Sequence, residues 1–458
     1  MNFSLVGLEE ILKAGSCSGC GACAVAEPDV VSMEKKPNGI ILPTRIRENI
    51  DRNPARVCPF SSDLIPNRRE LGSQKTGSSG SSEDLIGSYV FLGAGRMLGD
   101  EIWKSSSGGL TTWLLCQLLE NGAVDGIIHL GDSSTTSSVF EYKVSRTTSE
   151  ILQNRGSKYY ASSFKDALET IRSDTKKYAF IGVPCFINAI DLLRADSDLW
   201  REKIVFTIGL VCGHLKSEIF TEALSWQLGV APSDIQTVNF RIKDPLAKSS
   251  DYLFGSQSKS SGRWASRKVN TLVSSNWGQN AFSLQACSSC TDLFGYTSDV
   301  TFGDAWLNRY ESESRGTNIV VIRNPAIAKL FEIGSQSNQI FLEELESTQV
   351  LESQQGGIRH RVEGYLIRRN KQFRSLSPQS DFHTQFPSPT LRRRILVAYR
   401  AYMSEVTSRQ THLNDKAEFT RWIRGYRRLA IAYGVIDIVA RFSWKKAIQK
   451  IRHHRGMN

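Results

Sequence analysis

Apolar and polar positions alternate between two periods along the centre of the chain. Some segments carry apolar residues three and four positions apart, the pattern of a helix with one buried face, and short apolar runs between them are typical of buried strands. The pattern predicts helices at 110–119, 164–171, 186–193 and 217–228 and strands at 124–130, 178–183 and 204–211. This alternation is typical of an α/β domain with a largely parallel sheet.

The pattern changes after Ile235, where shorter strands and loops without a clear period extend to about Arg323. A helical region then leads to a break rich in serine and proline at 375–389. We therefore expect an α/β fold, α+β in part, with a larger domain at 86–375. A small cysteine-bearing unit at 1–60 precedes it, and the Ser/Gly-rich composition of 61–85 predicts a flexible linker between the two.

The last part of the chain, 390–458, is a predicted helical tail with basic character. An apolar series spaced by three and four predicts an amphipathic helix that contains Phe419, Trp422, Tyr426, Leu429, Tyr433, Ile436 and Ala440. From Pro387 onwards there are 16 Lys and Arg against 4 Asp and Glu, whereas the preceding 386 residues have a net charge of −1. Such a helix suits an anionic membrane surface, a protein partner or the body of the chain itself. No nucleic-acid-binding motif accompanies the charge, so a nucleic-acid partner is not expected.

Composition sets the class of protein. A chain of 458 residues with 40% hydrophobic and 22% charged residues fits a soluble globular protein of two or three domains. No secretory signal is recognised and no apolar stretch approaches the length of a membrane span, which predicts a cytoplasmic protein whose tail allows peripheral membrane attachment. In a reducing compartment, nine cysteines favour metal binding or catalysis over disulfides.

Four of these cysteines have the spacing of iron–sulfur ligands. Cys17, Cys20 and Cys23 are separated by two residues each, and Cys58 is followed directly by Pro59. Two-residue spacers let three thiolates surround one corner of a 4Fe-4S cluster, and the small residues between them let the backbone approach the sulfides. Zinc is the alternative, because tetrahedral thiolate sites use the same spacer.

A second set follows from the predicted topology. Cys185 and Cys212 each follow directly after a predicted strand, so both are expected at the carboxyl edge of neighbouring parallel strands, where α/β proteins bind ligands. Cys287 and Cys290 supply another pair with a two-residue spacer. Together they offer four thiolates for a second cluster, and the alternative is that Cys185 and Cys212 are small core residues. Cys116 lies within an apolar helix and is expected to be a buried thiol.

These cysteines are part of a wider resemblance. The chain resembles the family of coenzyme F420 hydrogenase/dehydrogenase beta subunits, which includes 7-hydroxymethyl chlorophyll a reductases and ferredoxin-dependent divinyl chlorophyllide reductases. The matching stretches, within 17–323, are the Cys17–Cys23 triplet with Cys58-Pro59, Ser106-Ser107-Gly108-Gly109, Gly156-Ser157-Lys158-Tyr159, Gly182-Val183-Pro184-Cys185, Cys212-Gly213-His214, Cys287-Ser288-Ser289-Cys290 and Asp299–Trp306. The Ser/Gly linker and the tail lie outside the resemblance.

The resemblance implies an iron–sulfur flavoprotein with two 4Fe-4S clusters and FAD. Flavin contacts are expected from Ser106, Ser107, Gly108, Gly109, Gly156, Ser157, Lys158 and Tyr159. The first motif opens a predicted helix, whose free N–H groups suit a phosphate or a flavin carbonyl, although a Ser/Gly helix start without ligand has the same sequence. Lys158 is suited to stabilise an anionic reduced flavin, or else is a solvated loop lysine. His214 is either a cluster neighbour or structural, and Asp304 and Trp306 line the site by resemblance only.

Two classes of function follow. The first is an oxidoreductase in which electrons pass from reduced ferredoxin, or a similar donor, through the two clusters to FAD and then to an organic substrate. The second is an electron-transfer subunit that serves a partner enzyme, with polysaccharide biosynthesis as one context because family members occur beside such proteins. A zinc-stabilised adaptor without flavin is the third alternative.

Overall fold

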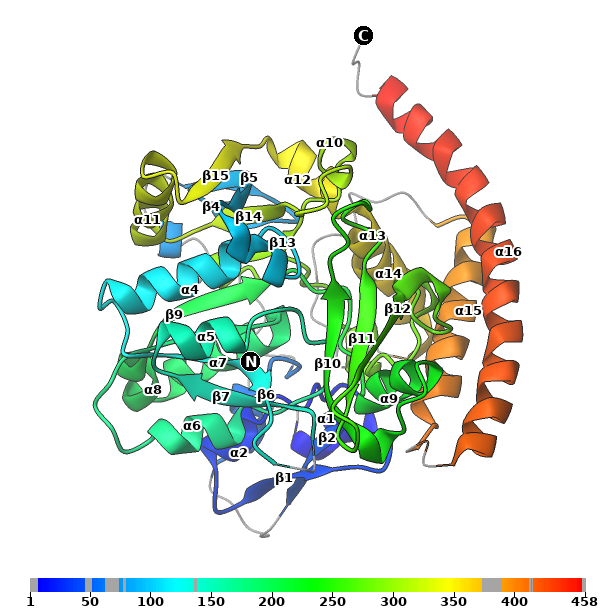
Figure 1. Cartoon of the computed structure of the whole chain (residues 1–458), viewed down its shortest axis with the longest axis horizontal. Coiled ribbons are helices and arrows are strands. Elements are labelled where there is room, and N and C mark those ends of the chain that lie inside the picture. Colours follow the sequence, from blue (N-terminus) through cyan, green and yellow to red (C-terminus); the bar gives the residue numbers. More distant parts are fainter. Residues whose placement is uncertain are drawn as a thin grey trace, which may run out of the picture.

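The computed structural model describes residues 7–45, 52–61, 74–76, 80–135, 138–372, 389–411, 413 and 415–454. Its centre is an eight-stranded mixed sheet with the order β15-β5-β14-β13-β9-β8-β6-β7 (Figure 1). The strands are β5 (Phe91–Met97), β6 (Gly126–Asp132), β7 (Phe140–Ser145), β8 (Tyr178–Gly182), β9 (Ile204–Leu210), β13 (Val300–Asp304), β14 (Asn318–Ile322) and β15 (Ile340–Glu344). Strands β6, β8, β9 and β13 pair in parallel, and the flanking pairings are antiparallel.

The α/β prediction is confirmed, but the expected parallel sheet is limited to those four central strands. The three predicted strands correspond to β6, β8 and β9. The four predicted helices correspond to α4 (Leu110–Glu120), α6 (Lys165–Ile171), α7 (Pro184–Asp196) and α9 (Glu218–Gln227). Strands β5, β7, β14 and β15 lie outside the predicted alternation, because an antiparallel partner needs no crossover helix to mark it in the sequence.

Helices cover both faces of this sheet. On one face, α4, α5 (Thr148–Gln153) and α11 (Pro325–Gln336) pack over a core that includes Ile127. On the other face, α6, α7 and α8 (Asp198–Lys203) pack over a core that includes Ile128. Consecutive residues of β6 thus enter opposite cores, as the period of a strand buried on both faces requires.

The N-terminal unit shares a core with the larger domain. It consists of α1 (Leu8–Lys13), α2 (Ala22–Ala26), the hairpin of β1 (Val31–Lys35) with β2 (Ile41–Arg45), and η1 (Pro54–Val57). Cys20, Ala22, Val25 and Val57 belong to the same buried cluster as the residues of α6 and α7. Unit and domain therefore form one packed body in the described residues.

The predicted linker is only partly described. Residues 62–73 and 77–79 lie outside the described part, but β3 (Ser81–Glu83), at the end of the range expected to be flexible, forms a hairpin with β4 (Gly87–Tyr89) at the start of the predicted domain. Lys75 Nζ lies 2.9 Å from Thr207 Oγ1 and 3.4 Å from Asp299 Oδ2. These described parts contact the domain, which differs from a free linker.

A second, three-stranded sheet begins at Ile235, but its first strand has eight residues and is longer than the short strands expected there. It contains β10 (Ile235–Ile242), β11 (Leu253–Ser258) and β12 (Trp264–Lys268), all antiparallel. The helical region after the main sheet contains α12 (Ser347–Ser353), α13 (Gln355–Ile358), the π-helix η9 (Arg359–Glu363) and α14 (Gly364–Gln372). The remaining short helices are η4 (Asp100–Lys104), η5 (Pro232–Asp234), η6 (Val269–Thr271), η7 (Trp277–Gln279), η8 (Gln285–Ser288) and α10 (Asn308–Glu311).

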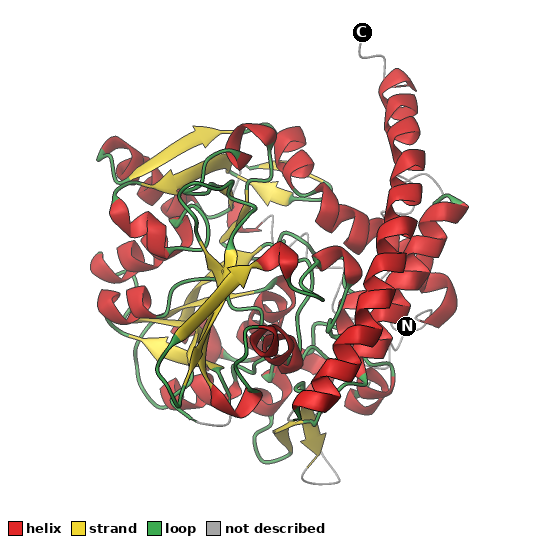
Figure 2. Cartoon of the chain, turned by 45° about the vertical axis from the view of Figure 1, so that its right-hand side comes forward, coloured by secondary structure: helices red, strands yellow, loops and turns green. Residues whose placement is uncertain are grey.

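The tail forms two long helices, α15 (Leu391–Ser408) and α16 (Lys416–His454), that run side by side along the body (Figures 1 and 2). The predicted apolar series of α16 faces inward, and Phe419, Tyr426, Tyr433 and Ala440 are buried in one core with α9, β10 and β11. Of the three surroundings expected for this series, the body of the chain is the one that covers it. Among the described residues no helix has the length and apolar character to span a bilayer.

Candidate redox site

The first cysteine set is built mostly by local turns. Cys17 and Cys20 follow α1, Cys23 lies in α2, and Cys58 follows η1. Gly21 has φ of +95°, and a Cβ there would lie 2.2 Å from Ser163 Oγ. The spacer needs glycine at this position because a side chain would suffer both a strained backbone and a collision.

The four thiols of this set interact with one another. Burial, together with repulsion from the neighbouring Cys20, raises the pKa of Cys17 to about 12. Burial also raises the pKa of Cys23, which is repelled by the other three cysteines of the set. In the described structure these four thiols are therefore hard to ionise. A bound cationic group would reverse this, because its positive charge would stabilise the four thiolates.

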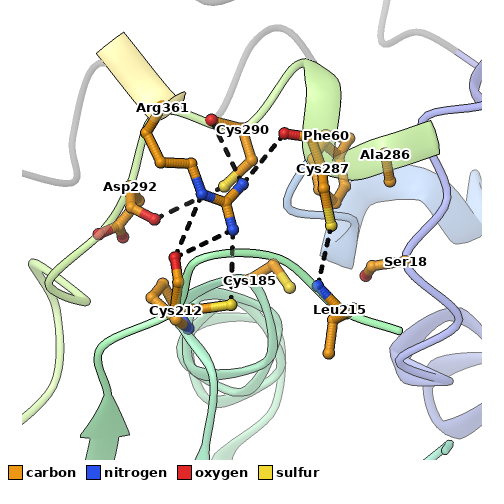
Figure 3. A pocket seen from close by; sticks show the side chains of 11 residues that line it. Ser18, Phe60, Cys185, Cys212, Leu215, Ala286, Cys287, Cys290, Asp292 and Arg361 are labelled. Atoms are coloured by element: carbon orange, nitrogen blue, oxygen red, sulfur yellow. Dashed lines mark hydrogen bonds between the residues drawn. The ribbon is translucent and has the colours of Figure 1, made fainter. Parts of the chain in front are cut away.

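The second set is assembled from distant parts of the chain (Figure 3). Cys185 begins α7 directly after β8, Cys212 follows β9, Cys287 lies in η8, and Cys290 comes shortly after it. The first two therefore lie at the carboxyl edge of neighbouring parallel strands, as the sequence predicts. All four line one small cavity, together with Ser18 and Phe60 of the N-terminal unit.

Arg361 binds the backbone around this cavity. Its guanidinium donates to the carbonyl oxygens of Cys212 (3.2 Å), Cys287 (3.1 Å) and Cys290 (3.4 Å), and also to Cys212 Sγ at 3.4 Å. The side chain is 2% exposed. Burial disfavours its charge, but the four surrounding cysteines outweigh this and raise its pKa. Arg361 lies on the π-helix η9, a rare element that recurs at functional sites.

Sequence reasoning missed Arg361 and the cations near it. Arg368 Nε donates to the carbonyl of Ser288 at 3.0 Å, and Lys216 lies close enough to Cys287 to lower the pKa of that thiol. Burial lowers the pKa of Arg368 to about 9 and that of Lys216 to about 7. In the sequence, Arg361 lies in a predicted helical region with no neighbouring cysteine, so nothing local marks its role.

The donor set of each cavity fits a 4Fe-4S cluster. No group of three or more His, Cys, Asp or Glu among the described residues is arranged to hold a single metal ion. A 4Fe-4S cluster does not need such convergence, because each of its four irons takes one thiolate. Among the described residues, buried polar atoms without a hydrogen-bond partner lie close in sequence to both sets: Ser16 Oγ, Ser61 Oγ and His214 Nε2, and His360 Nε2 lies next to Arg361. Such donors are suited to the sulfides of a cluster.

The two cysteine sets are close to each other. Cys20 of the first set and Cys185 of the second belong to one buried cluster, and Cys20 contributes to raising the pKa of the Cys185 thiol. Tyr142 packs against Phe186, and its pKa is raised by burial and by both cysteines. The fold thus brings the two sets into electrostatic contact.

The two predicted flavin motifs also lie side by side. The backbone N–H of Ser157 donates to Ser106 Oγ at 2.8 Å, and a Cβ on Gly156 would lie 3.4 Å from the same oxygen. Gly109 caps α4 with φ of +78°. One N–H group expected to face a ligand is already used, since Leu110 N donates to Asn318 Oδ1 at 3.2 Å.

Lys158 does not provide the free cation that the sequence suggests. Its Nζ donates to the carbonyls of Asn154 (2.6 Å) and Arg155 (3.3 Å) at the end of α5, and burial lowers its pKa to about 8. The cations beside the motif are instead on β10 and just after it. Lys243 Nζ donates to the carbonyl of Ser107 at 2.8 Å, and Arg241 forms a 2.7 Å ion pair with Asp304.

Lys243 and Arg241 were not predicted, although the resemblance implied Asp304 and Trp306. Burial and the neighbouring Arg241 lower the pKa of Lys243 to about 7. Arg241 is stacked over Tyr252 at 4.7 Å and over Trp306 at 5.6 Å, so both implied residues contact this arginine. The result is a partly buried cationic and aromatic region beside Ser106 and Ser157.

An aromatic side chain lies between the second cysteine set and this region. The ring of Trp277 lies 4.5 Å from that of His214, which is two residues after Cys212, and 4.8 Å from that of Tyr159 in the second flavin motif. Lys216 Nζ is also 4.9 Å from the Trp277 ring. Trp277 thereby contacts residues of both sites.

Two sets of four thiols, one in the N-terminal unit and one at the edge of the α/β sheet next to a cationic and aromatic region, are the pattern of an electron-transfer protein of the oxidoreductase class. The chain belongs to the family of coenzyme F420 hydrogenase/dehydrogenase beta subunits. The model of the N-terminal part of these beta subunits matches residues 94–169, and that of the C-terminal part matches residues 175–348.

Individual proteins are also similar to this chain. An uncharacterised protein of Methanocaldococcus jannaschii is 24% identical over 69% of this chain and 86% of its own length. One of the F420H2 dehydrogenase subunits of Methanosarcina mazei is 27% identical over 45% of this chain and 55% of its own length. The beta subunit of the coenzyme F420 hydrogenase of Methanosarcina barkeri is 31% identical over 28% of this chain and 46% of its own length. A chain of the F420-reducing NiFe hydrogenase complex from M. barkeri aligns at 19% identity over 64% of this chain and 96% of its own, with a TM-score of 0.48.

Proposed function

We propose that this protein is an iron–sulfur flavoprotein that conducts electrons from a ferredoxin-like donor to FAD and onward to an organic substrate. The observation that carries the proposal is that residues of the N-terminal unit line the cavity of the second cysteine set. Ser18 and Phe60, next to ligands of the first set, line the cavity of the second set. Electrons that enter at one set would therefore have a short route to the other.

Each cysteine set would hold one 4Fe-4S cluster. Cys17, Cys20, Cys23 and Cys58 would ligate the first, and Cys185, Cys212, Cys287 and Cys290 the second. When bound, the clusters supply one-electron steps and the flavin converts these into a two-electron step. Arg361 would fix the second ligand set by holding the carbonyls of three of its four cysteines.

The motifs around Ser106 and Ser157 would bind FAD. The adjacent cations suit its pyrophosphate and the anionic reduced ring. Lys243 Nζ, whose pKa is lowered to about 7, is suited to hold or release a proton near neutral pH beside this site. Trp277 and Tyr159 would exclude water between the flavin and the second cysteine set.

Composition after anaerobic purification tests the proposal. We expect about eight irons, about eight acid-labile sulfides and about one FAD per chain. Zinc in place of iron would support the adaptor instead and overturn the redox proposal. Ser106→Leu should release the flavin and retain the iron, whereas Ser173→Ala, a change in the exposed turn after α6 on the other face of the sheet from α4, should retain both.

The second candidate is an electron-transfer subunit that serves a partner enzyme. Relatives named as hydrogenase and dehydrogenase subunits favour it. A single-turnover experiment separates the two functions. Reduced ferredoxin is mixed with the protein and a tetrapyrrole, sugar-linked or deazaflavin acceptor. Reduction of the flavin without turnover of any acceptor would support the subunit, and turnover would support the enzyme.

A further inference from the structure

Exposed apolar side chains are concentrated on the two tail helices. Of the thirteen large apolar side chains that are exposed among the described residues, seven lie on α15 and α16. Four of them are on α16: Ile431 (64% exposed), Val435 (60%), Ile438 (60%) and Val439 (46%). Leu391, Ile395 and Tyr402 are the exposed ones on α15. Exposed apolar groups gathered in this way mark an interaction surface.

These side chains lie on the face of α16 that points away from the body. The inward face is already occupied, because Phe419, Tyr426 and Tyr433 are buried in the core. At 100° per residue, Ile431, Val435 and Ile438 lie on the opposite side of the helix from them. The outward apolar face is therefore distinct from the Trp- and Tyr-rich series that the sequence analysis identified.

Arginines precede the apolar residues on the same outward face. Arg421, Arg424 and Arg428 are exposed and line one shallow surface hollow of α16, whose N-terminal end also carries Asp415. Spacings of three and four residues continue from these arginines to Ile431, Val435 and Ile438. Between Arg421 and Ile438 the outward face is thus cationic at its beginning and aliphatic at its end.

Helix α15 extends this surface. It runs beside α16, and Tyr399 Oη donates to the carbonyl of Leu429 at 3.1 Å. Leu391 and Ile395 are 73% and 50% exposed, and Arg392 and Arg394 beside them are exposed as well. Figure 2 shows both helices at the edge of the molecule, with the end of α16 extending past the body.

We propose that the outward faces of α15 and α16, defined by Arg421, Arg424, Arg428, Ile431, Val435 and Ile438, dock this protein on an anionic lipid bilayer. Aliphatic side chains enter the acyl region while neighbouring arginines remain at the level of the phosphates. The charge is complementary, since the chain from Pro387 onwards has 16 basic and 4 acidic residues. A protein partner is the less suited occupant, because interface cores are enriched in aromatic residues and methionine as well as arginine, and among the described side chains of these outward faces Tyr402 is the one large exposed aromatic.

Vesicle cosedimentation of the full-length protein with its cofactors tests this surface. We expect binding to vesicles of phosphatidylcholine mixed with phosphatidylglycerol, and binding weaker by about tenfold or more to phosphatidylcholine alone or at high salt. The triple variant Ile431→Gln, Val435→Gln, Ile438→Gln and the triple variant Arg421→Glu, Arg424→Glu, Arg428→Glu should each lose binding.

Matched controls change the same residue types elsewhere. The apolar control is Leu246→Gln, at a side chain that is 98% exposed. The charge control is Arg263→Glu, at an exposed arginine between β11 and β12. Both variants should bind like the unchanged protein. Circular dichroism and iron content establish that each variant is folded. Equal binding by all variants, or no binding to the anionic vesicles, would overturn the proposal. So would self-association of the unchanged protein that the apolar triple variant abolishes, since the face would then be an interface between copies.

Discussion

The two cysteine sets have the same four donors but different electrostatic surroundings. Among the described residues, backbone N–H groups and the Ser18 hydroxyl are the groups that lower the pKa values of the first set, and no cation does so. The second set is held by the Arg361 guanidinium, with Lys216 close to Cys287. A cluster becomes more negative on reduction, so a buried cation makes that reduction easier. The difference implies a higher reduction potential at the second set, and electrons that enter at the first would run toward it.

The two sets also differ in how the chain builds them. Three ligands of the first lie within seven residues, whereas the second needs two strand ends, η8 and the nearby Cys290. The first should therefore tolerate disturbances in the sheet better than the second. This contrast in assembly and the contrast in charge can be tested separately.

Removal of one ligand from each set should have the largest effect. Cys20→Ser and Cys287→Ser are each expected to lose about half of the iron, because each would disrupt one of the two four-iron clusters proposed for this chain. Iron and sulfide analysis with electron paramagnetic resonance shows which cluster remains. Cys116→Ser is the control and should retain all iron, since this thiol belongs to neither set. Complete iron loss in both variants would show that the sets do not assemble independently.

Replacement of Arg361 should have the next largest effect. Arg361→Met removes hydrogen bonds from three buried carbonyls, so we expect unfolding free energy to fall by about 2–4 kcal/mol. Loss of the positive charge should lower the potential of the second cluster by about 60 mV or more, a tenfold change for one electron. A redox titration followed by electron paramagnetic resonance measures both clusters in one sample.

The first cluster is the internal control for that experiment. Its potential should be unchanged in Arg361→Met, because Arg361 does not act on its four thiols. Arg361→Lys should restore part of the potential but not the stability, since lysine keeps the charge and loses the planar set of donors. Equal shifts in both clusters would contradict the assignment of Arg361 to the second set.

The same contrast explains what the sequence could predict. In the first set, Cys17, Cys20 and Cys23 stand out in the sequence because they and their small spacers are adjacent, whereas Cys58 is marked by the Pro59 that follows it. In the second set, Cys185 and Cys212 stand out because they follow strands that prove to be parallel. Arg361, Lys243 and Trp277 escaped prediction, since each reaches its site from an element far away in sequence. Lys158 was expected to provide a cation beside the flavin because of its place in the second flavin motif. Its ammonium instead donates to the carbonyl of Asn154 at the end of α5.

The tail gives a parallel lesson about the fold. Its apolar period predicted an amphipathic helix, and α16 confirms this. The period alone left open what covers the apolar face, because a buried face and a membrane-bound face share one spacing. In the fold, packing against β10, β11 and α9 buries this face, and these contacts are distant in sequence.

A smaller effect is expected at Trp277, which lies between the second set and the flavin motifs. Trp277→Leu removes an edge-on ring contact with Tyr159 and a tilted ring contact with His214, so the unfolding free energy should fall by about 1–2 kcal/mol. Flavin reduction by reduced ferredoxin, followed by stopped-flow absorbance, should be severalfold slower while iron content stays constant. Trp264→Leu, a half-exposed tryptophan on β12, is the matched control. An unchanged rate would show that Trp277 does not shape the route to the flavin.

The smallest effect is expected at Arg56, where the N-terminal unit is joined to the domain by charge. Arg56 Nε lies 2.7 Å from Asp196 Oδ1 at the end of α7, and Nη1 lies 2.8 Å from Glu27 Oε1. Both carboxylates are partly exposed, so water screens the attraction, and Arg56→Gln should cost only about 0.5–1 kcal/mol. The unit is held mainly by the buried cluster around Cys20, Val25 and Val57, which this change leaves intact. Thermal unfolding should therefore shift slightly while the iron content and both potentials remain the same. Loss of the first cluster alone would mean that charge, rather than the shared core, positions that unit.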